Sequence, residues 1–594
     1  MFFSCIFLVS CVEVIFKVAN LTIKKLNHGV IRVKKKSAGF GSKPDKIIKL
    51  AKPAQEDVLQ LGSYFRQGRF SEARCFAQLL LQKFEPTDLV YNYYGLALEA
   101  QGDLKGAIQS YRKAILIDPN FADGHHNLAL SMKSIGNIGA AIDGYVKAIS
   151  INPEHFIAHN NLGNALCSIG KLEEAIRSYS KAIKVNPDFP EAYFNMGNVF
   201  RSLDFPKKAI ENYRIAVKKK PDFVEAYNYL GITLNLVGKI RAGVKELEKA
   251  TKLKPDYAEA YNNLGKAFYY MGRIGDSLQK YNKALFYRGN YAEAYCNRAV
   301  LFLYMGRDQD SIKDYKTALK IKPNYSEAYF GLGNAWNLIG EENKALVNYN
   351  KAIQFNPNHL SSKYMVASLT GKAVFSAPKE YVRDLFDNFA GKFDNSLIGK
   401  LNYKAPTQLM HMFVNAFGQK IEKFRMAVDL GCGTGLAGKA FRKYARFMVG
   451  IDLSKNMIEK ARKKKIYDEL IVEDFSKVLG QRIRVFDLFI CVDVFIYFGD
   501  LSEIFKLLRN RSRSLSVLAF STEHSDKRSF TLSRFGRFSH SKNYIHSLIN
   551  EYGFELVSFR TENLRKEGKK WVKGDFYLAR RTNNNSYIDS AMVA

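Results

Sequence analysis

Residues 427–435 read Ala-Val-Asp-Leu-Gly-Cys-Gly-Thr-Gly and close an apolar run. The run predicts a buried β-strand, and the glycines predict a tight turn into a helix. Glycines let the backbone pass close beneath a ligand, and the amino end of a helix favours a carboxylate there. The order Gly-x-Gly-x-Gly differs from the Gly-x-Gly-x-x-Gly of dinucleotide-binding folds. The stretch therefore predicts an α/β fold with a ligand at this turn.

Carboxylates stand at the ends of the next two predicted strands. Residues 447–451 form a short apolar strand, and Asp452 follows it. A carboxylate at that place can accept hydrogen bonds from both hydroxyls of a ribose. Residues 470–475 predict a third strand that carries Asp474. With Asp429 before the glycines, the chain thus presents three carboxylates around one predicted nucleotide site.

This order of motifs resembles class I S-adenosylmethionine (SAM) methyltransferases. The resemblance implies methyl transfer with SAM as cofactor, Asp474 near the adenine amino group, and Leu453 and Met457 beside the adenine ring. A related nucleotide-binding fold is the alternative. The cofactor-binding residues implied are Asp429, Gly431, Cys432, Gly433, Thr434, Gly435, Asp452, Leu453, Met457, Asp474 and Phe475.

Candidate catalytic groups lie at the end of a fourth strand expected over residues 485–494 and after it. Asp493 is a candidate base or acceptor-orienting group, and its alternative role is a helix N-cap. Histidine can titrate near neutrality, so His540 is a candidate base, and its alternative is a histidine on a surface loop. Arg537 and Arg565 are either solvated charges or ligands for a substrate carboxylate or phosphate.

Missing motifs narrow the methyl acceptor. No Asp/Asn-Pro-Pro-Tyr/Phe follows the fourth strand, which argues against methylation of amino groups on bases or glutamine. Cys491 is not preceded by proline, which argues against cytosine C5 methylation. Oxygen methylation of a small carboxylate or hydroxyl, or methylation of a protein side chain, stays open. The cysteines lack zinc-type spacing, so no metal site is expected.

Upstream of this region the sequence repeats every 34 residues. Alanine keeps the interval without exception at 114, 148, 182, 216, 250, 284, 318 and 352. Glycine recurs at 102, 136, 170, 238, 272, 306 and 340, with Asp204 at the remaining place. The spacing predicts two helices per unit with a glycine turn between them. Tyrosine, three residues before each alanine in most units, is expected to fill the gap between units.

The pattern resembles the tetratricopeptide repeat (TPR), which implies stacked helix pairs with a concave face for a protein or peptide. A row of asparagines in the first helix of the units resembles the asparagine ladder of O-GlcNAc transferases, which grips a peptide backbone. The alternative is that these amides bond neighbouring turns inside the solenoid. The row consists of Asn127, Asn161, Asn195, Asn263 and Asn297.

Taken together, the chain is similar to bacterial TPR-containing class I SAM-dependent methyltransferases over nearly its whole length. The expected fold is an all-α TPR superhelical solenoid followed by an α/β Rossmann-like class I methyltransferase domain. The expected divisions are a basic flexible segment 1–53, a solenoid 54–360 of about nine repeats with a degenerate first one, a helical linker 361–380, the methyltransferase domain 381–581 and a polar tail 582–594.

The chain of 594 residues carries a net charge of +33, which favours acidic partners. The net charge could reflect binding to nucleic acid or to an anionic membrane surface. The alternative is that the basic residues are lysines spread over solvated helix faces. The apolar run 2–12 is too short for a membrane-spanning helix and lacks the basic start of a signal peptide. Seven scattered cysteines suggest a reducing compartment, and so a cytoplasmic location.

The sequence therefore predicts a SAM-dependent methyltransferase whose repeats bind a protein or peptide and deliver the methyl acceptor. The alternative is a scaffold whose C-terminal domain binds SAM without turnover. Nucleic acid is a less favoured partner, because that interpretation rests on net charge alone.

Overall fold

The computed structural model describes residues 51–389, 393–394, 403–418, 421–481, 484–527, 529–567 and 570–582. The expected N-terminal segment, its apolar run and the polar tail lie outside these residues, except for 51–53 and Thr582. Contacts divide the chain into two compact units, Met1–Ala226 and Tyr227–Ala594. The division falls within the repeats, so the last repeats and the α/β region belong to one unit.

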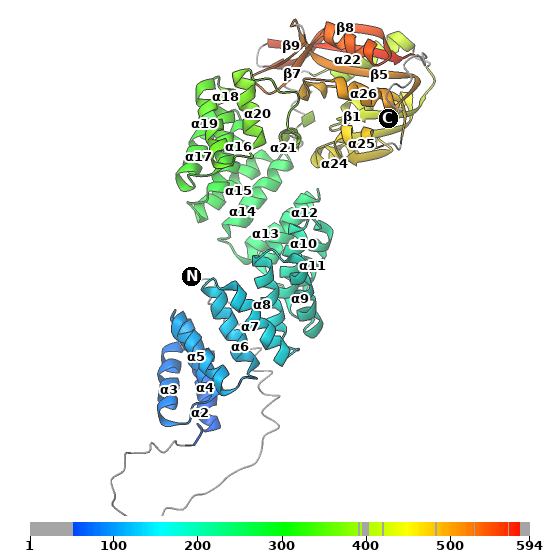
Figure 1. Ribbon diagram of the computed structural model, residues 1–594. Helices are drawn as coiled ribbons and strands as arrows, with labels where there is room; N and C mark the ends of the chain where they lie inside the picture. The colour runs from blue at the N-terminus through cyan, green and yellow to red at the C-terminus, as the bar shows by residue number, and fades with distance from the viewer. Residues whose placement is uncertain are drawn as a thin grey trace, which may run out of the picture. The chain divides into compact units, whose positions relative to one another are not determined.

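Successive helix pairs follow the 34-residue period along the chain (Figure 1). The first unit holds α2 (Gln55–Arg66), α3 (Phe70–Lys83), α4 (Asp88–Ala100), α5 (Leu104–Ile117), α6 (Ala122–Ser134), α7 (Ile138–Ile151), α8 (Phe156–Ser168), α9 (Leu172–Val185), α10 (Pro190–Ser202) and α11 (Pro206–Lys219). The series continues with α12 (Val224–Leu236), α13 (Ile240–Leu253), α14 (Ala258–Tyr270), α15 (Ile274–Tyr287), α16 (Ala292–Tyr304), α17 (Asp308–Ile321), α18 (Ser326–Leu338) and α19 (Glu342–Phe355).

The turn inside each pair contains one residue in the left-handed region, as the glycine spacing predicts. The backbone angle φ is 84° at Gly102 and 78° at Gly170. Asp204, which replaces a glycine, has φ of 58°. That conformation costs a residue with a Cβ about 1–2 kcal/mol, whereas glycine adopts it freely. The periodic glycines are therefore confirmed as turn residues.

The periodic tyrosine packs against the first helix of its own repeat and also against the next repeat, where Tyr281 clusters with Leu301 and Tyr179 with Val199. The expectation that it fills the gap between repeats is therefore confirmed. The Tyr281 ring of α15 lies against Gly265 of α14, where an added Cβ would be 2.6 Å from the ring. Gly163 and Tyr179 repeat the arrangement, with an added Cβ 2.5 Å from the ring. Glycine is needed here because the ring occupies the space of its missing side chain.

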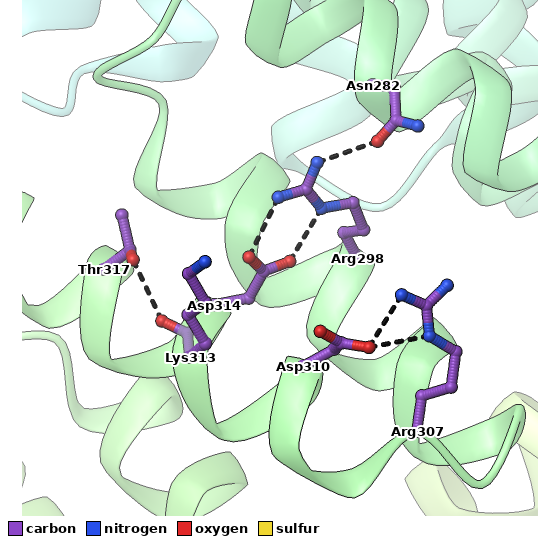
Figure 2. A network of polar contacts seen from close by, with 7 residues as sticks. All are labelled: Asn282, Arg298, Arg307, Asp310, Lys313, Asp314 and Thr317. Carbon is purple, nitrogen blue, oxygen red and sulfur yellow. Dashed lines mark hydrogen bonds and ion pairs between the residues drawn. The ribbon is translucent and has the colours of Figure 1, made fainter.

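The repeat formed by α16 and α17 contains a buried ion pair at positions where the neighbouring repeats have other residues. Arg298 of α16 holds Asp314 of α17 with two bonds, of 2.7 and 2.9 Å, and reaches Asn282 of α15 at 2.7 Å (Figure 2). The two charged side chains are only 19% and 6% exposed. Nearby, Arg307 and Asp310 pair at the start of α17. The buried pair thus ties three consecutive helices together.

Three helices lead from the repeats into the α/β region: α20 (Leu360–Thr370), α21 (Lys379–Phe389) and α22 (Ala405–Phe417). The region then contains β1 (Phe424–Leu430), α23 (Leu436–Phe441), η3 (Arg442–Tyr444), β2 (Ala445–Asp452), α24 (Lys455–Lys463), β3 (Glu469–Val472), α25 (Phe475–Gly480), β4 (Phe486–Cys491), η4 (Phe495–Tyr497), α26 (Ser502–Arg511), β5 (Ser512–Ser525), β6 (Phe530–Leu532), β7 (Phe538–Ser541), α27 (Lys542–Glu551), β8 (Phe554–Glu567) and β9 (Lys570–Arg581).

Within the described residues the strands form one nine-stranded mixed sheet in the order β3-β2-β1-β4-β5-β7-β6. The strands from β3 to β5 are parallel, and β9 pairs antiparallel with both β5 and β8. The order of strands reverses between β1 and β4. In parallel α/β sheets, ligands bind beyond the carboxyl ends of the strands at such a reversal.

Helices cover both faces of the sheet. Phe505 of α26, Leu479 of α25 and Ile545 of α27 pack with one face. Phe413 of α22 and Phe441 of α23 pack with the other. The predicted fold class is therefore confirmed: helical repeats precede an α/β region built around a mixed sheet.

An apolar cluster joins the last repeats to the α/β region within the second unit. Tyr364 and Met365 of α20 are each 3% exposed and pack with Tyr497 and Phe538. The Tyr364 hydroxyl also donates a hydrogen bond to Gly536 O at 3.1 Å. The segment expected to be a linker thus contains a helix that is part of a shared core.

Among the described helices, none has the length and apolar character that a membrane crossing requires.

Candidate functional site

The turn after β1 passes through three glycines in the left-handed region. The angle φ is 65° at Gly431, 52° at Gly433 and 91° at Gly435. A Cβ at Gly431 would collide with Val494, whereas at Gly433 the nearest atom, in Phe393, would be 3.7 Å away. The Gly433 backbone is therefore less crowded than that of Gly431, and the Phe393 ring lies over it at ordinary van der Waals distance.

Asp452 ends β2 and holds this turn. Its Oδ2 accepts the Gly433 N–H at 2.8 Å, and its Oδ1 accepts the Ser454 N–H at 2.8 Å. Burial raises the pKa of Asp452 to about 6, although the two N–H groups act to lower it. A carboxylate has about four lone-pair sites, so Asp452 can still accept hydrogen bonds from a diol.

Asp429 supports the turn from within the core. Its side chain is 1% exposed, and its Oδ2 accepts a 2.6 Å hydrogen bond from the Tyr467 hydroxyl. Burial raises the pKa of Asp429 to about 7. The Tyr467 ring also lies against Gly435 and Gly438. Sequence analysis missed Tyr467, because nothing in the local pattern pairs it with a strand 38 residues away.

Asp474 begins α25, beyond the end of β3. Its Oδ1 accepts the Ser476 N–H at 2.8 Å, and its Oδ2 forms an ion pair with Lys379 of α21. The Lys379 side chain is 67% exposed, whereas that of Asp474 is 7% exposed. An exposed lysine thus pairs with the carboxylate that sequence analysis assigned to an adenine amino group.

The apolar residues expected beside the adenine differ in exposure. Leu453 is half-buried after β2, Phe475 is 7% exposed and Met457 is fully buried. The predicted adenine contact of Met457 therefore requires its side chain to move. Phe475 packs edge-on against Phe498, with ring centroids 5.5 Å apart.

Polar groups from the segment before the sheet reach the same site, which sequence analysis did not anticipate. Asp387 of α21 accepts a 2.6 Å hydrogen bond from the Ser454 hydroxyl. Asp394 accepts hydrogen bonds from the Thr434 hydroxyl and, at 2.6 Å, from Lys464 Nζ. This segment therefore contacts both the glycine turn and the start of α24.

These residues fit SAM. The uncrowded glycine turn lies at the start of α23, Asp452 has lone pairs for further hydrogen bonds, and Asp474 lies next along the sheet edge. Of the residues predicted from sequence, the structure brings together those of the turn and of the ends of β1, β2 and β3. No cluster of three metal-ligating side chains occurs in the part of the chain that the structure describes.

Asp493 follows β4 and has a strained backbone. Its φ is 58°, and its N–H donates to the Ser521 hydroxyl at 3.0 Å. Its Oδ2 pairs with Arg565 Nη1 at 3.4 Å. The alternative role as a helix N-cap is wrong, because Val494 occupies that position at η4 and no side chain caps it. Burial raises the pKa of Asp493, although Arg565 opposes this effect.

Arg565 is not the solvated charge that one of the two expectations gave, and its role as a ligand for a substrate carboxylate or phosphate stays a prediction. Its side chain is 5% exposed, so it is not a solvated charge, and it pairs with Glu523 as well as Asp493. Arg537 is 25% exposed and lies 3.6 Å from Glu523. Sequence analysis missed Glu523, which lies in a polar stretch at the end of β5 that gives no local signal of a site.

His540 lies in β7 and is fully buried, so the alternative of a surface loop is wrong. Its Nε2 donates to Gly499 O at 3.0 Å, and burial lowers the pKa of His540 to about 4. The imidazole is therefore neutral near pH 7. This geometry favours a structural role, and the catalytic role predicted for His540 stays a prediction.

The asparagine row lies in the repeats and links each unit to the one before it. Each amide of the row bonds to a side chain 35 residues earlier at 2.9–3.0 Å. The pairs are Asn127 with Asn92, Asn161 with His126, Asn195 with Asn160, Asn263 with Asn228, and Asn297 with Asn262. One N–H of each amide is therefore used inside the solenoid, as the alternative interpretation held.

Protein-family models match parts of the repeats and part of the α/β region. A family described as "Methyltransferase domain" matches residues 428–518. Families described as "TPR repeat" and "Tetratricopeptide repeat" match residues 95–136, 145–177, 163–203, 237–272 and 292–325. The protein thus contains TPR repeats and a methyltransferase domain.

Individual relatives are distant. The chain is 32% identical over 63 residues to the 18S rRNA (guanine-N(7))-methyltransferase RID2 of Arabidopsis thaliana, covering 11% of this chain and 22% of that protein. It therefore spans about a fifth of the length of this curated relative. Among solved structures it is similar to MamA (30% identity, 28% of this chain, 96% of that chain, TM-score 0.26). It is also similar to YrrB, "a TPR protein with an unusual peptide-binding site" (24% identity, 31% of this chain, 95% of that chain, TM-score 0.27).

Proposed function

We propose that the α/β region is a SAM-dependent methyltransferase and that the repeats bind a protein or peptide partner. The first part rests on one observation: the Asp452 carboxylate accepts hydrogen bonds from the backbone N–H groups of Gly433 and Ser454, at the point where the strand order reverses. A carboxylate beside a glycine turn at that edge is suited to a ribose and the group attached to it.

Each part of the site has a role in this proposal. SAM supplies a methyl group bound to a sulfonium. Asp452 accepts hydrogen bonds from the ribose hydroxyls, and the turn at Gly433 lets the backbone approach the amino-acid end. Asp474 exchanges Lys379 for the adenine amino group. Positioning of donor and acceptor supplies much of the rate of such a displacement.

Calorimetry with SAM tests the proposal. Loss of charge-assisted hydrogen bonds costs about 1.5–3 kcal/mol, so Asp452→Ala should weaken SAM binding about 10- to 100-fold. Asp487→Ala is the matched control, because Asp487 caps the other end of the sheet, where its Oδ2 accepts the Met426 N–H. Wild-type affinity should fall as pH drops through about 6, where Asp452 becomes protonated. Equal affinities for wild type and Asp452→Ala would reject the proposal.

The repeats are proposed to recruit the methyl acceptor or a protein that carries it. Support comes from the TPR matches and from the asparagine row, whose amides keep a second N–H beyond the bonds between repeats. The carboxamide oxygens of Asn127 and Asn161 already accept hydrogen bonds within their own repeats. Removing residues 54–220 should leave SAM affinity intact and lower methyl transfer to components of a cell extract. Unchanged transfer would reject recruitment by these repeats.

A scaffold that binds SAM without turnover is the alternative. Full-length protein incubated with SAM and cell extract distinguishes the two, because only an enzyme produces S-adenosylhomocysteine at a rate that depends on the extract.

RNA is a second candidate acceptor, supported by the match to RID2 and by the net charge of +33. Binding of single-stranded RNA that weakens steeply with salt yet still differs between sequences would favour it. Binding that depends only on salt would reflect general attraction of charges.

A cytoplasmic location remains a prediction from the scattered cysteines. It is supported by the free thiols of Cys75, Cys167, Cys296, Cys432 and Cys491.

A further inference from the structure

Three features of the backbone meet beyond the carboxyl end of β4. Asp493 follows β4 with a positive φ, held by the bond from its N–H to Ser521. The strand β5 runs past the end of β4, which places Glu523 beyond the last β4–β5 pair. In β8 the register shifts between Asn563 and Arg565, as at a β-bulge. Bulges and strained residues gather at functional sites because they aim side chains where a regular strand would not.

The side chains aimed in this way form a buried cluster of charges. Arg565 pairs with both Asp493 and Glu523, and Arg537 lies 3.6 Å from Glu523. The exposed fractions are 5% for Arg565, 13% for Glu523 and 17% for Asp493. The Tyr403 side chain also lies close enough to Asp493 to influence its pKa. Burying such charges costs folding free energy even when they are paired, so stability alone does not account for the cluster.

The cluster adjoins the proposed cofactor site. Val494, the residue after Asp493, lies directly against Gly431 of the glycine turn. The strands β1 and β4 that carry these residues are neighbours and run parallel. A methyl group bound at the turn therefore has Asp493 on the adjacent strand end.

The atoms of the cluster that are already paired, and the one that is not, indicate which kind of ligand group could bind there. Both arginines face Glu523, so their charges are engaged. Asp493 Oδ1 is buried and has no hydrogen-bond partner among the described residues. A buried oxygen without a partner is costly, and a ligand that donates a hydrogen bond would satisfy it.

We propose that Asp493, with Glu523, Arg537 and Arg565 around it, forms the methyl-acceptor site, and that the acceptor is a nitrogen or hydroxyl group that carries a hydrogen. This inference rests on the proposed function. Asp493 is the catalytic residue, and Arg565 and Glu523 are positioning residues that act through it. A carboxylate or phosphate acceptor is disfavoured, because it would face the open carboxylate oxygen instead of an open cation.

The transfer step balances within this site. The lone pair of the acceptor nitrogen or oxygen forms a bond to the methyl carbon while the carbon–sulfur bond breaks, and its electron pair returns to sulfur. The sulfonium becomes a neutral thioether. The hydrogen of the acceptor passes as a proton to Asp493 Oδ1, so the methylated product is left without that proton.

The chemistry of the product tests the class of acceptor. Full-length protein is incubated with methyl-labelled SAM and cell extract, and the labelled product is treated with mild alkali. Methyl esters release volatile methanol under these conditions, whereas methyl groups on nitrogen or in ethers do not. We expect the label to stay with the product, and release of labelled methanol would overturn the inference. If wild-type protein does not bind SAM in calorimetry, the proposed function itself fails.

Variants test the residues. Asp493→Asn preserves size and should lower label incorporation about 100-fold or more, because general-base catalysis contributes at least that factor. SAM affinity should stay within about twofold of wild type. Asp526→Asn is the control, since that side chain is 98% exposed and stands outside the cluster. Incorporation by Asp493→Asn equal to that of the control would reject the assignment.

The pH profile tests Glu523 in a way that a purely structural role would not. The charged and titratable groups that face Asp493 are Arg565, Arg537, Glu523 and Tyr403. The carboxylate of Glu523 raises the pKa of Asp493, so Glu523→Gln should shift the acid limb of the transfer rate to lower pH. A lower rate with an unmoved acid limb would mean that Glu523 serves stability alone, and would overturn its positioning role.

Discussion

The hydrogen-bond donors that face a buried carboxyl group of the α/β region determine its role. Asp429 and Asp452 are raised in pKa by burial, but Asp429 faces a tyrosine hydroxyl whereas Asp452 faces two backbone N–H groups. The first arrangement keeps a carboxyl group inside the core, and the second holds an anion at the sheet edge. The same residue type thus supports the turn in one place and is suited to a ligand in the other.

Asp429 should make stability depend on pH. Its pKa of about 7 in the folded protein exceeds the usual value of 3.8, so folding favours the protonated form. The resulting contribution is complete below about pH 4 and is lost as pH rises through about 7. The difference in melting temperature between Asp429→Asn and wild type should therefore increase in favour of the variant as pH rises between these two values. The expected change is about 2–4 °C for each kcal/mol. Thermal unfolding at several pH values measures it, and parallel curves for both proteins would contradict it.

Sequence spacing predicts the site residues that belong to one strand and its following turn. The Gly431–Gly435 turn and Asp452 follow from such a pattern, because each stands directly after an apolar strand. Tyr467 and Asp387 do not, because each reaches the site from a distant segment through one side-chain bond. Arg565 looked like a surface charge, since a bulge and not the strand period turns it inward.

At the scale of helices, the repeats depend on close contact between glycine and tyrosine. Gly265→Ala would put a Cβ 2.6 Å from the Tyr281 ring, and overpacking of this kind costs about 1–3 kcal/mol. Gly275→Ala is the matched control in the next helix, because no atom lies within 4 Å of its added Cβ. The control should be neutral or gain up to about 1 kcal/mol, since alanine favours a helix over glycine. Denaturant unfolding followed by circular dichroism compares them, and equal losses would refute the packing argument.

The Arg298–Asp314 pair should be costly to break from one side only. Arg298→Leu would leave Asp314, 6% exposed, without its cation, at a cost of about 3–5 kcal/mol. Adding Asp314→Asn should recover much of that loss, because the following unit has Leu332 and Asn348 at these positions. A double-mutant cycle in denaturant measures the coupling. Additive losses would show that the two side chains do not act as a pair.

The strands show which elements can be predicted from local sequence patterns and which cannot. The cores of β1, β2 and β4 coincide with predicted apolar runs, because buried parallel strands are continuous in sequence. The pair β6–β7 was not predicted, since its three- and four-residue strands depend on pairing with each other and with β5. The helix α22 was missed as well, although its apolar face covers one side of the sheet.

For the whole molecule, the division into units differs from the division into repeats and enzyme. The sequence changes character after residue 360, so sequence analysis placed a linker there. In the structure, α20 lies in that segment and buries Tyr364 and Met365 against Tyr497 and Phe538. The second unit accordingly starts at Tyr227, within the repeats. Periodicity identifies where repeats end, but it does not reveal which surface their last helix covers.

Two truncations should therefore differ in stability. A chain of residues 221–594 keeps α12 to α20 with the α/β region, whereas a chain of residues 371–594 lacks α20 and exposes Tyr497 and Phe538. Uncovering a large apolar side chain costs about 1.5–3 kcal/mol, so the shorter chain should lose about 5 °C or more in the melting temperature of the α/β region. Calorimetry with and without SAM follows that transition. In the full chain, Tyr364→Ala should lower the same transition, and Lys363→Ala, on the exposed side of α20, should not. Equal melting temperatures for the two truncations would mean that the α/β region folds without support from the last repeats.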